Sequence, residues 1–281
     1  MLRRIIIGCV FICVLLSVSC NEKSQNKTVK STEKEKIEIS NYTPNPPSDF
    51  SYELSEDMKS VVLKSYKGTS PIVFFPTEIE GIPVKELCPL DYSYEGVEIT
   101  TVIIPEGFEK IPDGFCPYVL SKLYLPTTLK EIGAGAFFVD FDHLVLPPNV
   151  TKLRGNFCGS FINGIKTIEL PANLKKIDES AFCNSSIKEI VLPDSVESIE
   201  DCAFMGAELK SITLSKNLKK IGESAFFQCE YLEEVIIPEE IQKVEFVKDT
   251  KFNVSKAFCD CPKLSLKSQA ALRRIGYDED F

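Results

Sequence analysis

The sequence predicts a mainly β protein, a right-handed solenoid of about seven to eight coils that ends in a short capping helix. The first observation is a phrase that occurs seven times, in which an alternating apolar segment ends at a corner residue and is followed by two apolar positions and a Phe. The second is the 21 to 24 residue spacing of the corners, a period typical of stacked coils. The corners are Pro105, Pro126, Pro147, Pro171, Pro193, Ser215 and Pro238.

A single copy, residues 120–137, shows how one coil is expected to fold. Apolar and polar residues alternate over 122–125, which predicts a short strand with one face inward. Pro126 lacks a backbone N–H, so it ends the strand and turns the chain. Leu129 then faces the core from a second side, and Phe137 returns a large ring to the core. We therefore expect two short strands and a buried Phe in every coil.

The N-terminus has the features of a secretory signal peptide over residues 1–20. Arg3 and Arg4 precede an apolar run that is short for a membrane span, which needs about 20 residues. Cys20 follows small residues and resembles the lipidated cysteine of bacterial lipoproteins, although Ser17 stands where that signal usually has Leu. Lipidation of Cys20 is the favoured interpretation, and ordinary cleavage that leaves a free cysteine is the alternative.

Four further segments are expected after the leader. Residues 21–49 are mostly polar and should form a flexible tether. Residues 50–98 should form an N-terminal cap and entry coil, with a hairpin of Tyr52–Leu54 and Val61–Tyr66. The repeats occupy 99–263, and a C-terminal cap occupies 264–281.

The C-terminal cap is expected to contain a helix over Ser268–Ile275, because Gly276 stands at a typical helix end and basic residues precede it. The last repeat also carries an insertion, Glu245–Ser255. It is either a hairpin that seals the end of the solenoid or a protruding recognition loop, and the seal is slightly favoured.

Composition narrows the class of function. The formal net charge is −9, and removal of Arg3 and Arg4 with the leader gives −11, which argues against a nucleic-acid partner. No catalytic or phosphate-binding motif is present, and His143 is the one histidine. The sequence therefore predicts a protein that is not an enzyme and has no cofactor or metal.

Eight of the eleven cysteines lie after Cys20, most of them just behind a repeat Phe. The favoured interpretation is that they are small buried thiols. The alternative is disulfides between neighbouring coils, and the best pairs would then be Cys158–Cys183 and Cys229–Cys261. A zinc site is disfavoured because Cys259 and Cys261 have no second pair of ligands.

The proline corner and the Ala-Phe pair over 99–258 resemble the BspA-type leucine-rich repeats of bacterial surface proteins. The resemblance implies a leucine-rich-repeat solenoid and an adhesive function at the cell envelope. It also implies protein ligands, with matrix proteins such as fibronectin among the targets of relatives. With Cys20 lipidated, the chain would be an outer-membrane lipoprotein, on the cell surface or facing the periplasm. A structural or accessory envelope lipoprotein that assists glycan capture is the alternative.

The outward positions of the first strands should form two columns along the solenoid. The first column consists of Thr101, Lys122, His143, Thr167, Glu189, Ser211 and Glu234, and the second of Ile103, Tyr124, Val145, Glu169, Val191, Thr213 and Ile236. The second column is unexpectedly apolar, which indicates either strand preference or a stripe that binds a partner. The candidate ligand-binding residues are Lys122, Tyr124, His143, Val145, Thr167, Glu169, Glu189, Val191, Thr213 and Ile236. The second strands expose many lysines, which we interpret as a solvated face, with an anionic partner such as an acidic glycan or lipid as the alternative.

Overall fold

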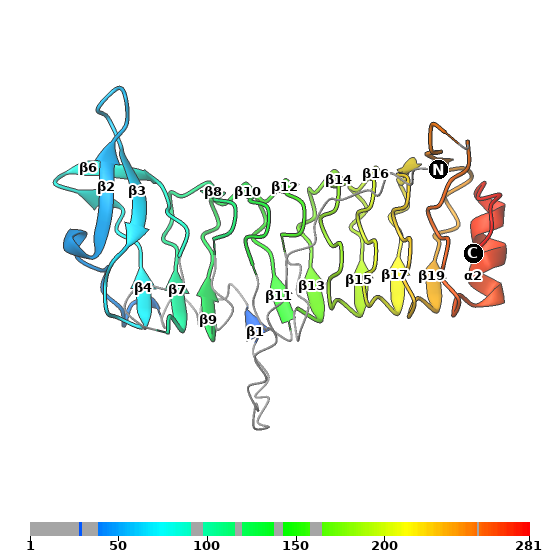
Figure 1. Ribbon diagram of the computed structural model, residues 1–281, viewed down its shortest axis with the longest axis horizontal. Helices are drawn as coiled ribbons and strands as arrows, with labels where there is room; N and C mark the ends of the chain where they lie inside the picture. The colour runs from blue at the N-terminus through cyan, green and yellow to red at the C-terminus, as the bar shows by residue number, and fades with distance from the viewer. Residues whose placement is uncertain are drawn as a thin grey trace, which may run out of the picture.

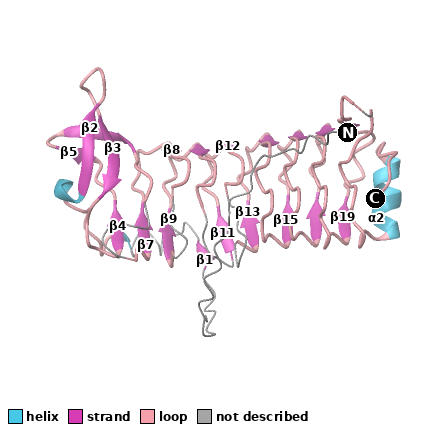
Figure 2. Ribbon diagram, viewed as in Figure 1, coloured by secondary structure: helices cyan, strands magenta, loops and turns pink. Residues whose placement is uncertain are grey.

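The computed structural model describes residues 28–29, 39–90, 98–115, 120–137, 143–157, 165–251 and 253–281. These residues form an elongated solenoid with the N-terminal cap at one end and a helix at the other (Figures 1 and 2). The leader, Cys20, Cys116 and Cys158, and with them the proposed Cys158–Cys183 pair, lie outside the described residues. The predicted mainly β solenoid is confirmed.

The first strands of the coils lie along one side of the solenoid and pair in parallel (Figure 1). We call this side the first-strand face. Its strands are β4 (Ile72–Phe74), β7 (Thr101–Ile103), β9 (Lys122–Tyr124), β11 (His143–Val145), β13 (Thr167–Glu169), β15 (Glu189–Val191), β17 (Ser211–Thr213) and β19 (Glu234–Ile236).

The second strands form a parallel ladder on another side, which we call the second-strand face (Figure 2). Each is two residues long. They are β8 (Lys110–Ile111), β10 (Glu131–Ile132), β12 (Lys152–Leu153), β14 (Lys176–Ile177), β16 (Ser198–Ile199), β18 (Lys220–Ile221) and β20 (Glu245–Phe246).

Both ladders are interrupted near the middle of the solenoid. On the first-strand face, β4-β7-β9 form one sheet, and a second sheet runs from β11 to β19. The short strand β1 (Thr28–Val29), from the segment expected to be a tether, pairs in parallel with β11 and contacts β9. On the second-strand face, β8-β10-β12 and β14-β16-β18-β20 are separate sheets. The second break coincides with the longest step between corners, the 24 residues from Pro147 to Pro171.

The core is a row of phenylalanine rings, one from each coil, as predicted. Phe182, Phe204 and Phe226 are fully buried. Phe204 stacks on Phe182 with ring centroids 5.0 Å apart and on Phe226 at 5.0 Å, with interplanar angles of 4° and 3°. Leu129 and Ile132 are likewise fully buried, which confirms the inward positions of the second strand. Each coil therefore buries its apolar face only against the neighbouring coils.

Tight turns return the chain to the core before each Phe. Gly135 has a left-handed backbone, with φ of 57°, and the same position is left-handed in later coils, at Ser180, Cys202 and Ser224. Gly133 serves a different purpose, because a Cβ there would lie 2.5 Å from the backbone N of Asp113 in the preceding coil. Close stacking of the coils thus depends on this glycine.

The N-terminal cap contains the predicted hairpin. Strands β2 (Phe50–Leu54) and β3 (Val61–Tyr66) pair antiparallel, and β2 begins two residues earlier than expected. A short 3-10 helix, η1 (Pro47–Asp49), precedes β2. Strand β6 (Ile82–Glu86) pairs with β3 in parallel and with β5 (Glu78–Ile79) antiparallel, which extends the cap to four strands.

The helix α2 (Leu266–Arg274) begins two residues before the predicted start at Ser268 and ends one residue before Ile275. Its N-cap is Ser265, whose side chain accepts a hydrogen bond from the backbone N–H of Ser268. This capping contact determines where the helix starts, because it gives an acceptor to a backbone N–H in the first turn that has no partner within the helix. Gly276 follows the helix with φ of 112°, as expected for a helix end.

The predicted insertion in the last repeat is shorter than expected. Glu245 and Phe246 form β20 and pair with β18, so they continue the repeat. Phe246 packs against Tyr277 of the C-terminal cap, with ring centroids 5.2 Å apart. Lys248 pairs with Glu279, the two charged atoms lying 3.2 Å apart. These contacts join the start of the segment to the C-terminal tail and favour the sealing interpretation.

Candidate binding surfaces

The first-strand face carries the candidate ligand-binding residues in register. His143 is aligned with Thr167, and Thr167 with Glu189, so the first column is continuous across β11, β13 and β15. In the second column Val191 is aligned with Thr213, and Thr213 with Ile236. Lys122 and Tyr124 lie on β9, beyond the break in the sheet, and do not pair with β11. The structure therefore brings eight of the ten residues into one sheet.

Exposure of the second column changes along the solenoid. Ile103 is fully buried and Tyr124 is 8 % exposed, so the apolar stripe does not begin where the sequence predicted it. Tyr124 lies on β9, which β1 contacts, and this end of the face is therefore not open. Val191 is 65 % exposed and Ile236 44 % exposed, and Thr213 between them is half-buried. Within this column Val145 is half-buried, and the exposed apolar side chains are those of Val191 on β15 and Ile236 on β19.

His143 is the polar centre of the first-strand face. Its Nδ1 lies 2.8 Å from the hydroxyl of Thr167, and its Nε2 lies 2.9 Å from a carboxylate oxygen of Glu169. Both partners come from β13, so the ring bridges two neighbouring strands. Hydrogen bonds on both ring nitrogens fix the orientation of the imidazole. The arrangement presents a rigid polar group beside the apolar residues of β15 to β19.

The lysines of the second-strand face are largely paired with acids from neighbouring coils. Lys130 lies 2.7 Å from Glu109, and Lys219 lies 2.6 Å from Glu197. The hydrogen bond from Lys219 lowers the pKa of the Glu197 carboxyl. Exposed pairs of this kind contribute at most about 1 kcal/mol each. The positive charge of these lysines is therefore balanced by neighbouring carboxylates over much of this face, which fits a face that contacts only solvent.

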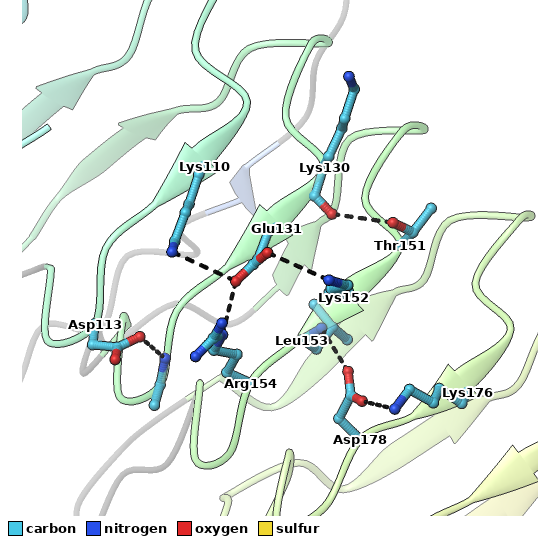
Figure 3. Close-up of polar contacts among 11 residues, drawn as sticks. Lys110, Asp113, Lys130, Glu131, Thr151, Lys152, Leu153, Arg154, Lys176 and Asp178 are labelled. Carbon is cyan, nitrogen blue, oxygen red and sulfur yellow. Dashed lines mark hydrogen bonds and ion pairs between the residues drawn. The ribbon is translucent and has the colours of Figure 1, made fainter. Parts of the chain in front are cut away.

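A cleft interrupts the second-strand face where β12 and β14 fail to pair (Figure 3). Its volume is about 690 Å³. The Asp178 carboxylate accepts a hydrogen bond of 3.2 Å from the backbone N–H of Leu153, and thus replaces a ladder bond between the strands. The Asp178 carboxylate also lies 2.6 Å from the ammonium of Lys176, and their hydrogen bond raises the pKa of Lys176. The longer step between corners, from Pro147 to Pro171, coincides with this cleft, but the spacing alone does not predict it.

Beside the cleft, Glu131 is surrounded by three cations (Figure 3). The Nε of Arg154 donates a hydrogen bond of 2.7 Å to its carboxylate. The ammonium groups of Lys110 and Lys152 lie farther away, at 3.7 and 3.8 Å. The Glu131 side chain is 18 % exposed. Lys110, Lys152 and Lys176 are among the lysines expected on a solvated face, whereas no pattern in the sequence pointed to Arg154 or Asp178.

Six cysteines in the described residues are free. Cys229 and Cys261 are buried, and each thiol donates to the carbonyl of a Phe in the preceding coil, at 3.1 and 3.2 Å. Both thiols are free and each has its own acceptor, so the disulfide considered for this pair is not formed. Burial raises the pKa of Cys261 to about 12 and that of Cys88 to about 12.

We expect Cys88 and Cys261 to resist alkylation in the folded protein at pH 8. A pKa raised from 9.0 to about 12 lowers the thiolate fraction about a thousandfold. Mass spectrometry of each cysteine after timed iodoacetamide treatment measures the effect, with the same reaction in denaturant as control. Equal rates in both conditions would contradict this expectation.

The raised pKa values also predict how stability depends on pH. Because the folded state favours the neutral thiols of Cys88 and Cys261, their contribution to the free energy of unfolding is present below pH 9 and is lost as the pH rises toward 12.

Within the ranges that the structure describes, no group of His, Cys, Asp and Glu side chains is arranged to hold a metal ion. No helix in those ranges combines the length and apolar character needed to cross a membrane.

Short parallel strands, proline corners and a ring stack repeated every 21 to 24 residues define a leucine-rich-repeat protein. A family model for the BspA type leucine rich repeat region matches residues 90–163 and 156–277, in six copies. This match spans more than half of the chain, so the protein belongs to the BspA-type leucine-rich-repeat family.

Two solved structures show the same fold. The leucine-rich-repeat protein of Treponema pallidum is 24 % identical, with a TM-score of 0.54, over 85 % of this chain and 99 % of that one. The pneumococcal vaccine antigen PcpA is 17 % identical, with a TM-score of 0.51, over 79 % of this chain and 69 % of that one. No curated protein matches the sequence.

Proposed function

We propose that this protein is a non-enzymatic, lipid-anchored adhesin of the bacterial cell envelope, and that it binds a protein partner through the first-strand face. The observation that carries this proposal is the exposure of Val191 and Ile236 in one register column of a rigid sheet. Large apolar side chains exposed on one face and bordered by charged residues are a feature of protein interfaces. Membership of a family of interaction scaffolds supports a protein partner.

The residues around this apolar column fit an interface. Glu189 and Glu234 are exposed on the neighbouring column of the same strands. The bridge from His143 to Glu169 holds polar groups in fixed positions at the edge of the apolar surface. A protein partner would thus bury Val191 and Ile236 and meet a polar rim, which is the usual anatomy of a specific interface.

Cys20 is the proposed lipid attachment site, in an outer-membrane lipoprotein. The support is the sequence alone, a short apolar run followed by small residues and this cysteine. A lipid on Cys20, with the mostly polar residues that follow it, would hold the solenoid away from the bilayer. The glycan-capturing accessory role is the second candidate, and the cleft between β12 and β14 favours it, because its lysine, arginine and carboxylate side chains can form hydrogen bonds with sugar hydroxyl groups.

The proposal is tested by protease treatment of intact cells, followed by binding assays with the purified mature chain. A surface adhesin is degraded on intact cells, whereas a periplasmic protein is protected. In the binding assay, immobilised matrix proteins, with fibronectin as the first probe, are expected to retain the chain at micromolar concentration or below. Protection from protease together with absence of binding to every matrix protein would contradict the adhesin function.

A further inference from the structure

We propose that a pocket at the C-terminal end of the solenoid binds a neutral oligosaccharide, with Tyr231 as its main aromatic contact. The pocket lies in the turns that precede β19 and α2, and its volume is about 560 Å³ (Figure 1). Its lining residues are Gln228, Glu230, Tyr231, Asp260, Pro262, Lys263 and Phe281. None of them lines the cleft between β12 and β14. The pocket gives the glycan-capturing role, the second candidate above, a site of its own and does not depend on the adhesin function.

The pocket lies where the turns behind the ring row become longer. The step from the buried Phe to the next buried Leu or Ile is five residues at Phe182 and Phe204, but six at Phe226 and Phe258. Because both ends of each turn are fixed in the core, the additional residue enlarges the turn on its outer side. Tyr231 stands in the first of the two longer turns and is 44 % exposed. The longer turn therefore brings a large aromatic side chain to the surface.

Two aromatic rings supply apolar surface to the pocket. The ammonium groups of Lys263 and Lys188 lie 4.6 and 5.9 Å from the centre of the Tyr231 ring. The half-buried Phe281 ring packs against Tyr277, with ring centroids 5.2 Å apart. These contacts hold both rings in place, so little conformational freedom is lost when a ligand binds. Aromatic rings offer flat apolar area to the C–H groups of a sugar, and the tyrosine hydroxyl adds a polar group at the edge.

Polar side chains without a partner surround the rings. In the part of the chain that the structure describes, no hydrogen bond or ion pair involves the side chains of Gln228, Glu230 or Asp260. The Lys263 ammonium contacts the Tyr231 ring and has no carboxylate partner among the same residues. Carboxylates accept hydrogen bonds, an ammonium group donates them, and an amide does both. Sugar hydroxyl groups also do both, so a saccharide can bond with every one of these groups.

The charge of the lining favours a neutral ligand. Glu230 and Asp260 oppose Lys263 alone, which gives the lining side chains an excess charge of −1. This excess repels an acidic glycan. A cationic ligand would in turn meet the two ammonium groups, of Lys263 and Lys188, that already lie beside the Tyr231 ring. A neutral oligosaccharide meets neither repulsion.

The test measures binding of defined oligosaccharides to the full mature chain by calorimetry. The neutral probes are maltohexaose, cellohexaose and mannohexaose, and a galacturonate hexasaccharide is the acidic probe. We expect at least one neutral probe to bind with a dissociation constant of about a millimolar or below, and the acidic probe not to bind. A rise in salt from about 0.05 to about 0.5 M should leave the affinity unchanged, because a neutral ligand carries no charge to be screened.

Variants locate the site. Tyr231→Ala is expected to weaken binding at least about tenfold, because it removes the ring. Tyr231→Phe keeps the ring and loses only the hydroxyl, so it should weaken binding less than Tyr231→Ala does. The matched control is Tyr52→Ala, since Tyr52 is 39 % exposed on β2 in the N-terminal cap, and this change should leave the affinity unchanged. Thermal melts verify that each variant is folded.

Three outcomes would overturn the proposal. They are the failure of every neutral probe to bind, equal weakening by Tyr231→Ala and Tyr52→Ala, and binding of the galacturonate probe that falls with added salt. The matrix-protein assay separates this site from the adhesin function, because Tyr231→Ala should leave capture of the matrix protein unchanged. Absence of matrix-protein binding in a chain that still binds a neutral probe would contradict only the adhesin function.

Discussion

Replacement of Phe204 by Ala is expected to lower the free energy of unfolding by about 3–5 kcal/mol. The ring is fully buried and stacks on Phe182 and Phe226, both at 5.0 Å. Its removal leaves a cavity between three coils, and the stacked rings on either side cannot close it because their backbones are held by parallel ladders. In a solenoid the damage also weakens both interfaces of the altered coil, since stability is the sum of neighbour contacts.

Urea denaturation followed by circular dichroism measures this loss. Val191→Ala is the matched control, because that side chain is 65 % exposed in the same half of the solenoid and its truncation should change stability by less than about 0.5 kcal/mol. Phe204→Leu keeps most of the apolar volume and should fall between the two. A loss below about 1 kcal/mol for Phe204→Ala would mean that the ring row is not the principal core.

The double substitution of Val191 and Ile236 by Glu is expected to reduce capture of the protein partner at least about tenfold, with little change in melting temperature. Burial of two unpaired carboxylates at the centre of an interface is strongly unfavourable. In the free protein both positions are exposed, at 65 % and 44 %, so the new charges stay in water. The measurement is surface plasmon resonance with the matrix protein that binds the unaltered chain.

Met58→Glu is the matched control for this effect. Met58 is 69 % exposed in the turn of the N-terminal hairpin, far along the chain from β15 and β19. Its replacement adds one carboxylate to exposed apolar surface, where the double variant adds two. Equal loss of capture in Met58→Glu and in the double variant would indicate a non-specific effect of charge. Unchanged capture in the double variant would place the binding site on another face.

The sequence predicts the repeating part of this fold well because the same residue types recur at the same positions in each coil. Pro126 was expected to end a strand, and Leu129 and Phe137 were expected to be buried. In the structure β9 ends before Pro126, and both apolar side chains lie in the core. Prediction fails where a contact comes from elsewhere in the chain. Tyr124 is outward by its alternation, yet it is buried on the strand that β1 contacts.

The candidate sites were predicted only in part for the same reason. Register within one sheet follows from the spacing of the corners, so the column that contains Val191 and Ile236 could be found from the sequence. The cleft could not, because it depends on how two coils separated by a longer step fail to pair. Arg154 and Asp178 acquire their importance from that separation, and nothing in their immediate sequence marks them.

The two breaks in the ladders have a mechanical consequence. From β13 onward, neighbouring coils are tied by two parallel ladders, which resist torsion. The coil of β11 and β12 is tied through β12 to the N-terminal coils and through β11 to the C-terminal coils, with one ladder to each. We therefore expect twisting between the two halves of the solenoid to be easiest at this coil, with β1 bridging β11 and β9 across the break on the first-strand face.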